Sequence, residues 1–168
     1  MRSHWVILCA VLFSFACSRH RQQAPVEYPN QMGEIAFDPK ADNPAFKLCN
    51  ENDLVHSRTS LGYEGGRRHI LDISKEMIEK EGLDVNYSGY IMAHFLVNCK
   101  GEAGRFRLEA MDMGFMQQEA PEELMAAVKK VVSSLNEWTI TKASNAGKDH
   151  SKYLNFKFVN GQLDAITH

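Results

Sequence analysis

Apolar residues recur at every second position in two neighbouring stretches of this sequence. The first stretch, residues 90–97, carries apolar side chains at its odd-numbered positions, and the second alternates Phe106, Leu108 and Ala110 with charged residues. A period of two is typical of strands with one buried face. Residues 98–104 between them are rich in turn formers, so this region predicts a β-hairpin with one solvated face.

Two other segments repeat apolar residues at helical spacing. Residues 66–81 form an amphipathic pattern that ends at Gly82. Residues 121–135 begin with a proline and two glutamates, which suit the positive end of a helix dipole, and then repeat apolar residues at spacings of four, three and four. Both segments therefore predict helices.

The C-terminal region alternates once more. Residues 153–159 place three apolar side chains on one face, and Asn160-Gly161 predicts a type I′ turn into a short strand over 162–166. The order is helix, strand, strand, helix, strand, with one small strand more. The predicted fold class is α+β, in two layers, with a small antiparallel sheet packed against two helices.

The N-terminal residues have the pattern of an export signal. Arg2 precedes a continuous apolar run over 5–15, which is too short to span a bilayer but suits a secretory signal. Residues 14–18 resemble a bacterial lipobox, in which a small residue precedes a cysteine that is lipidated. We therefore predict a signal peptide over 1–16 and lipid attachment at Cys17, with cleavage nearby without lipid as the alternative.

The residues that follow divide into a tether and a domain. Residues 17–44 contain several prolines and no sustained apolar period, so we expect lipid attachment and a flexible tether there. Residues 45–168 contain all the predicted helices and strands. The mature protein would thus be a domain held at a membrane by acyl chains rather than by a spanning helix.

Four cysteines have different expected roles. Cys9 leaves with the signal peptide and Cys17 is the lipid candidate, so Cys49 and Cys99 remain. Two cysteines in an exported domain are most simply a disulfide. Free thiols and a metal pair are the alternatives, although no Cys-x-x-Cys or Cys/His ligand spacing supports a metal.

The order of these elements resembles the C-terminal domain of TonB-family proteins of Gram-negative bacteria, over about residues 60–160. The residues that carry the resemblance are Tyr63-Glu64-Gly65-Gly66 before a helix, the strand 89–98, Gly101 in the turn, a helix ending near Trp138, and the aromatic strand 154–158. The resemblance implies a TonB C-terminal-like fold. It also implies a periplasmic location in the cell envelope and a link to transport across the outer membrane.

Several function classes lack support in the sequence. No nucleophile elbow, P-loop, dinucleotide fingerprint or H-E-x-x-H motif occurs, and His69 and His94 are interpreted as satisfied or solvated histidines. A formal net charge of −2 provides no cationic field for a phosphate backbone. We therefore predict no enzyme activity, no catalytic residues, no cofactor, no metal and no nucleic acid partner.

A cluster of three methionines could be interpreted in two ways. Met111, Met113 and Met116 lie within six residues, and thioethers are soft ligands that suit Cu(I). The simpler interpretation is that these side chains fill an irregular edge of the core.

The function predicted from the sequence is a noncatalytic binding module. A small open sheet has unpaired backbone groups at its edge, so the domain could capture a protein or peptide of the cell envelope by strand addition. The residues that would contact the partner cannot be named from the sequence. The alternatives are a structural envelope lipoprotein without a transport role and a small binder of metal or solute that uses the methionines.

The lipid prediction can be tested directly. Cys17→Ala should abolish the partition of the mature protein with membranes, because the acyl chains alone would hold it there. The measurement is membrane fractionation combined with radiolabelled palmitate. Wild-type protein that incorporates no label would contradict the lipid anchor.

Overall fold

The computed structural model describes residues 35–56, 61–140 and 146–167, which belong to one compact unit. The predicted signal peptide, residues 1–16, and Cys17 lie outside the described residues. Among the residues that are described, no helix has the length and apolar character needed to cross a bilayer.

In the described residues, two helices and seven strands make an α+β fold, as the sequence predicts. The elements are β1 (Leu54–Val55), β2 (Leu61–Tyr63), α1 (Gly66–Lys80), β3 (Gly89–Val97), β4 (Ala103–Met111), α2 (Glu122–Ser134), β5 (Trp138–Ile140), β6 (Asp149–Val159) and β7 (Gln162–Thr167). Both predicted helices and the four longest predicted strands are present, within a few residues of the expected bounds. The predicted turn is also confirmed, with positive φ of 50° at Asn160 and 79° at Gly161.

The main sheet is mixed rather than antiparallel. β6 lies between β3 on one side and β7 on the other, and β4 pairs with β3 at the outer edge. These pairs are antiparallel, but β1 runs parallel to the start of β6, with Leu54 opposite Asp149. The prediction of an antiparallel sheet is therefore wrong for β1, because a strand of two residues has no period that a sequence pattern can reveal.

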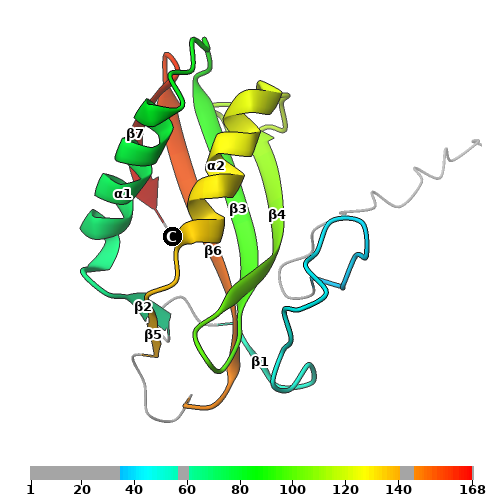
Figure 1. Cartoon of the computed structure of the whole chain (residues 1–168). Helices are drawn as coiled ribbons and strands as arrows, with labels where there is room; N and C mark the ends of the chain where they lie inside the picture. The colour runs from blue at the N-terminus through cyan, green and yellow to red at the C-terminus, as the bar shows by residue number, and fades with distance from the viewer. Residues whose placement is uncertain (1–34, 57–60, 141–145, 168) are drawn as a thin grey trace, which may run out of the picture. The chain divides into compact units, whose positions relative to one another are not determined.

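Both helices pack on the same face of the main sheet (Figure 1). The fully buried side chains Ile91, Phe95 and Phe156 of the sheet belong to one core with Val128 of α2 and Ile70 of α1. Burying one such side chain stabilises a fold by about 1.5–3 kcal/mol. The residues that alternate in the sequence thus point in turn to this helix-covered face and to the opposite face of the sheet. We call the opposite face the outer face.

Part of the outer face is covered by the chain that precedes β1. Ile35 and Phe46 are buried there with Leu96 of β3, and the ring of Phe46 lies so close to Gly104 that a Cβ would approach it to 2.4 Å. We expected residues 17–44 to be a tether. The described part of that range, residues 35–44, lies against the sheet in this structure.

An ion pair fastens this segment to β4. Both carboxylate oxygens of Asp42 accept hydrogen bonds from the guanidinium of Arg107, at 2.7 and 2.8 Å, and the Asp42 side chain is 1% exposed. Arg107 also donates to the carbonyl of Ala36 at 2.9 Å. The Arg107 hydrogen bonds hold the pKa of Asp42 below its usual range.

A two-stranded sheet of β2 and β5 lies apart from the main sheet, and no pattern in the sequence predicted it. Tyr63 and Trp138 are opposite each other in this pair, with ring centroids 5.0 Å apart. The buried ammonium of Lys152 in β6 donates to the carbonyl of Leu61 at 3.3 Å, and burial lowers the pKa of this lysine. Lys152 thus links the small sheet to the main one.

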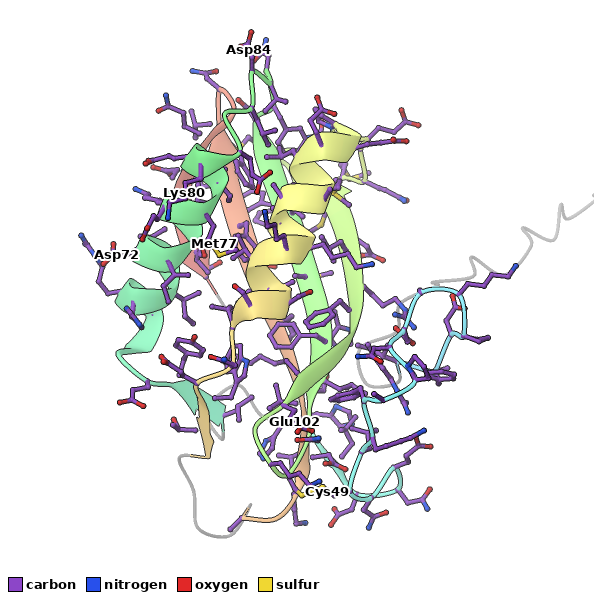
Figure 2. The ribbon with its side chains drawn as sticks, viewed as in Figure 1. Cys49, Asp72, Met77, Lys80, Asp84 and Glu102 are labelled. Carbon is purple, nitrogen blue, oxygen red and sulfur yellow. A yellow bond between two sulfur atoms is a disulfide. The ribbon has the colours of Figure 1, made fainter. Side chains whose placement is uncertain are left out.

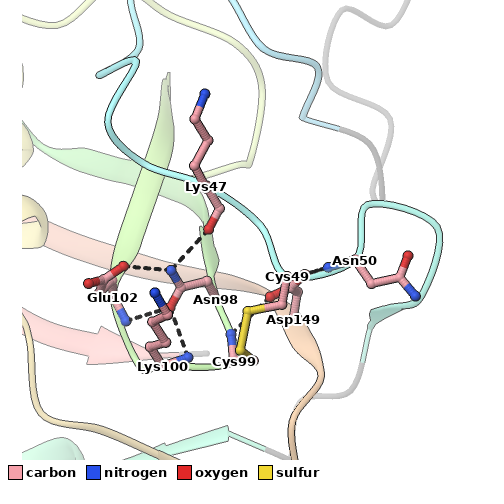
Figure 3. Close-up of a disulfide and its surroundings, with 8 residues drawn as sticks. All are labelled: Lys47, Cys49, Asn50, Asn98, Cys99, Lys100, Glu102 and Asp149. Carbon is pink, nitrogen blue, oxygen red and sulfur yellow. Dashed lines mark hydrogen bonds between the residues drawn. A yellow bond between two sulfur atoms is a disulfide. The ribbon is translucent and has the colours of Figure 1, made fainter.

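The predicted disulfide is present between Cys49 and Cys99, whose Cα atoms are 6.0 Å apart (Figure 3). It connects the segment before β1 to the turn between β3 and β4. Beside it lies the fully buried carboxylate of Asp149, which accepts the N–H of Cys99 at 2.9 Å and the N–H of Asn50 at 2.7 Å. One covalent bond and two charge-assisted hydrogen bonds therefore hold three distant segments together.

Removal of the disulfide should weaken the whole domain. Cys49→Ser/Cys99→Ser should lower the free energy of unfolding by about 2–5 kcal/mol, because the unfolded chain gains the freedom of a long open loop. Urea unfolding of the oxidised wild type and of the variant measures this difference. Wild type treated with a thiol reductant is the control and should match the variant, whereas equal stability of all three would contradict a stabilising bridge.

Candidate functional site

The disulfide lies at the turn of the β3–β4 hairpin, and the candidate site, formed by the edge of β4 and the loop that follows it, lies toward the opposite end. Figure 2 shows Cys49 and Glu102 near each other at one end of the molecule and Asp84 at the other. The sulfur atoms of Cys49 and Cys99 lie within 4.8 Å of each other and of an oxygen of Asp149, but the two sulfurs are bonded to each other. Sulfurs in a disulfide are not thiolate ligands, so this cluster has a structural role here.

The outer edge of β4 is open in its central part. Gln118 donates its backbone N–H to the carbonyl of Ala110 at 3.1 Å, which shows that the backbone C=O of Ala110 points away from β3, toward the open edge. Because edge groups alternate along a strand, Leu108 and Phe106 face the same way. No backbone hydrogen bond from elsewhere in the described ranges reaches the edge groups of these two residues, and the Phe106 carbonyl accepts only the side chain of Arg107.

The opposite edge of the sheet is less suited to pairing. β7 covers β6 there. β7 itself is short, and its register shifts so that Asp164 is not paired with any residue of β6. The carboxylate of Asp164 instead accepts the ammonium of Lys157 at 2.6 Å. A bulge and a charged side chain are common means of blocking an edge strand.

The loop that follows β4 presents three large apolar side chains to solvent. We call residues 112–118 the apolar loop. Met113, Phe115 and Met116 are 43%, 62% and 68% exposed. Oδ1 of Asp112 accepts the N–H groups of Gly114 at 2.8 Å and Met116 at 2.9 Å, so the loop is held by its own hydrogen bonds. Exposed apolar groups on an ordered loop are typical of interaction sites.

Phe115 is held in an unfavourable backbone conformation. Its φ is 62°, in the left-handed region that bulky residues rarely adopt, and its ring stacks on Tyr90 with centroids 4.6 Å apart and an interplanar angle of 15°. Such strain persists only where the surrounding contacts enforce it, and it is concentrated at functional sites. The stack places the apolar loop over the outer face, next to the open edge of β4.

Two side chains fix the point where the loop leaves β4. The hydroxyl of Tyr87 lies 3.0 Å from the carbonyl oxygens of Tyr90 and Met111. The amide of Gln118 donates to the carbonyls of Ser88 and Met111, at 3.3 and 3.2 Å. The apolar side chains are therefore presented by a braced loop.

The structure corrects the simpler interpretation of the methionine cluster. Met113 and Met116 do not fill an edge of the core, because both are exposed, and only Met111 at the end of β4 is partly buried. The sequence feature that could have indicated an exposed loop is the presence of three large apolar residues beside the turn formers Asp112 and Gly114. A periodic pattern cannot separate an exposed loop of this kind from a frayed strand end.

His94 is a satisfied histidine on the outer face. It is 7% exposed, and its Nε2 lies 2.7 Å from Oγ of Ser151. Burial lowers the pKa of His94, the positive charges of His56 and Arg107 lower it further, and the carboxylate of Glu109 opposes them. This histidine therefore favours its neutral form in the folded protein.

Comparison with models of known protein families, with curated proteins and with solved structures found no significant match to this chain. The candidate site is an open strand edge next to a braced, exposed apolar loop.

His94 should make the stability of the fold sensitive to acid. The pKa of His94 is depressed in the folded state. Its contribution to the unfolding free energy is therefore fully present above its pKa in the unfolded chain, about 6.5, and is lost as the pH falls through its pKa in the folded protein. His94→Gln, which can still bond Ser151, should lose less unfolding free energy than wild type between about pH 7.5 and about pH 5.

Urea unfolding at the two pH values measures this difference. His69→Gln, at an exposed position of α1, is the matched control and should behave like wild type. Identical acid sensitivity of His94→Gln and wild type would show that the buried histidine does not contribute to it.

Proposed function

We propose that this protein is a noncatalytic, membrane-tethered binding module of the periplasm that captures an extended segment of an envelope protein or peptide. In this proposal the domain is a two-layer fold similar to the TonB C-terminal domain. The partner adds a strand to the outer edge of β4, and the activity serves transport at the outer membrane. The single observation that carries the proposal is the open edge at Phe106 and Leu108 beside the apolar loop.

The length of this edge determines how the binding energy is divided between main-chain hydrogen bonds and side-chain contacts. Below Phe106 the register with β3 shifts, and Arg105 has a φ of 53°, whereas above Leu108 the N–H of Gln118 already occupies the carbonyl of Ala110. Main-chain hydrogen bonds are therefore few. In strand addition the side chains of the added segment supply the remaining affinity and the choice of partner. The apolar loop is the adjacent surface that such side chains would contact.

The proposal is tested by removing one edge donor. Leu108→Pro lacks the outward N–H but keeps the side of β4 that pairs with β3, and proline is tolerated on edge strands. We expect this variant to recover none of the envelope proteins that wild type captures from an envelope extract. Leu108→Ala is the matched control, because it also loses the leucine side chain but retains the N–H, and it should still capture them.

Hydrogen exchange gives a second measurement on the same edge. The amides of Phe106 and Leu108 should exchange rapidly in the free protein and become protected when a captured partner is bound. Equal recovery of partners by Leu108→Pro, with no change in exchange at these amides, would contradict strand addition. That result would favour a structural envelope lipoprotein without a transport role.

A further inference from the structure

The apolar loop lies in a part of the chain that has negative charge only. Residues 108–128 contain five carboxylates, Glu109, Asp112, Glu119, Glu122 and Glu123, and no lysine, arginine or histidine. Glu119, Glu122 and Glu123 are exposed. No ion pair with another described residue involves any of these three glutamates.

Two of these carboxylates, Glu122 and Glu123, lie on the side of the sheet opposite Phe115. Phe115 stacks on Tyr90 and therefore lies over the outer face. Glu122 and Glu123 are in the first turn of α2, which packs on the helix-covered face and begins near the end of β4 (Figure 1). An incoming strand would thus meet the apolar loop on the outer face and the carboxylates of Glu122 and Glu123 on the helix-covered face.

The cations on nearby strands are already paired. Lys157 is opposite Tyr90 in the sheet, and its ammonium lies 2.6 Å from Asp164. Arg107, in β4, is held by both oxygens of Asp42. Neither of these cations is paired with Glu119, Glu122 or Glu123.

From this charge pattern we infer that the partner is a cationic, apolar peptide strand, in which apolar residues alternate with lysine or arginine. The inference rests on the proposed strand addition and names its partner class. Because side chains of a strand alternate between faces, apolar residues would pack on Phe115 and Met116 while the cations point toward Glu119 and Glu122. A second copy of this chain or an anionic bilayer would instead bring like charges together, which opposes binding.

Two synthetic probes test the inference. One is a fluorescent ten-residue peptide in which valine alternates with lysine, and the other has glutamate in place of every lysine. By fluorescence anisotropy, full-length protein should bind the lysine peptide at least about tenfold more tightly than the glutamate peptide. Its affinity should fall several-fold when the salt concentration is raised from about 0.05 M to about 0.3 M, because salt screens exposed charges.

Variants separate the charge from the apolar contact. Glu119→Lys/Glu122→Lys should remove or reverse the preference for the lysine peptide. Glu64→Lys/Glu79→Lys makes the same change in net charge at exposed positions before and within α1, and it should leave the preference as in wild type. Phe115→Ser should weaken binding of the lysine peptide without changing its salt dependence.

The outcomes also distinguish this inference from the proposed function. Equal binding of both peptides, or no effect of Glu119→Lys/Glu122→Lys, would overturn the cationic partner while leaving the edge experiments with Leu108→Pro to decide on strand addition. Charge-dependent binding that survives in Leu108→Pro would support the cationic partner and overturn strand addition. Phe115-dependent binding to vesicles containing anionic phospholipid, or Phe115-dependent dimerisation, would overturn the inference in favour of those occupants.

Discussion

A buried carboxylate at the start of β6 is the interaction on which the arrangement of this domain depends. Asp149 is fully buried, and each of its oxygens accepts a backbone N–H from a different segment, those of Asn50 and Cys99. The disulfide of Cys99 with Cys49 joins these two segments covalently. A buried charge is tolerable only when it is well bonded, so the carboxylate and the disulfide stabilise the same junction in complementary ways.

This junction allows the two faces of the sheet to differ. The helices bury the apolar side chains of one face, whereas described residues 35–53, fixed at Cys49 and by the pair of Asp42 with Arg107, cover part of the outer face. The other end of the β3–β4 hairpin keeps its edge and its apolar loop accessible. The same hairpin is thus anchored covalently at one end and presents an accessible surface at the other.

Periodicity predicted most of the fold because long strands and helices bury a regular set of side chains. It predicted α2 and the alternation of β3 correctly, and the two cysteines left after the predicted signal peptide and lipid site predicted the disulfide. It could not predict β1 or the β2–β5 pair, since strands of two or three residues carry no period. It also missed the exposure of Phe115 and the role of Asp149, because both depend on contacts between segments distant in sequence.

The short open edges would have a consequence for this protein if, as we propose, acyl chains hold it at a membrane surface. Lipid anchoring confines molecules to two dimensions, where collisions between neighbours are frequent and long bare strands would template aggregates. Here the edge of β4 is interrupted at Arg105 and occupied at Ala110, and that of β7 is bulged at Asp164. Crowded copies would therefore stay soluble and separate, while a segment with suitable side chains could still be accommodated.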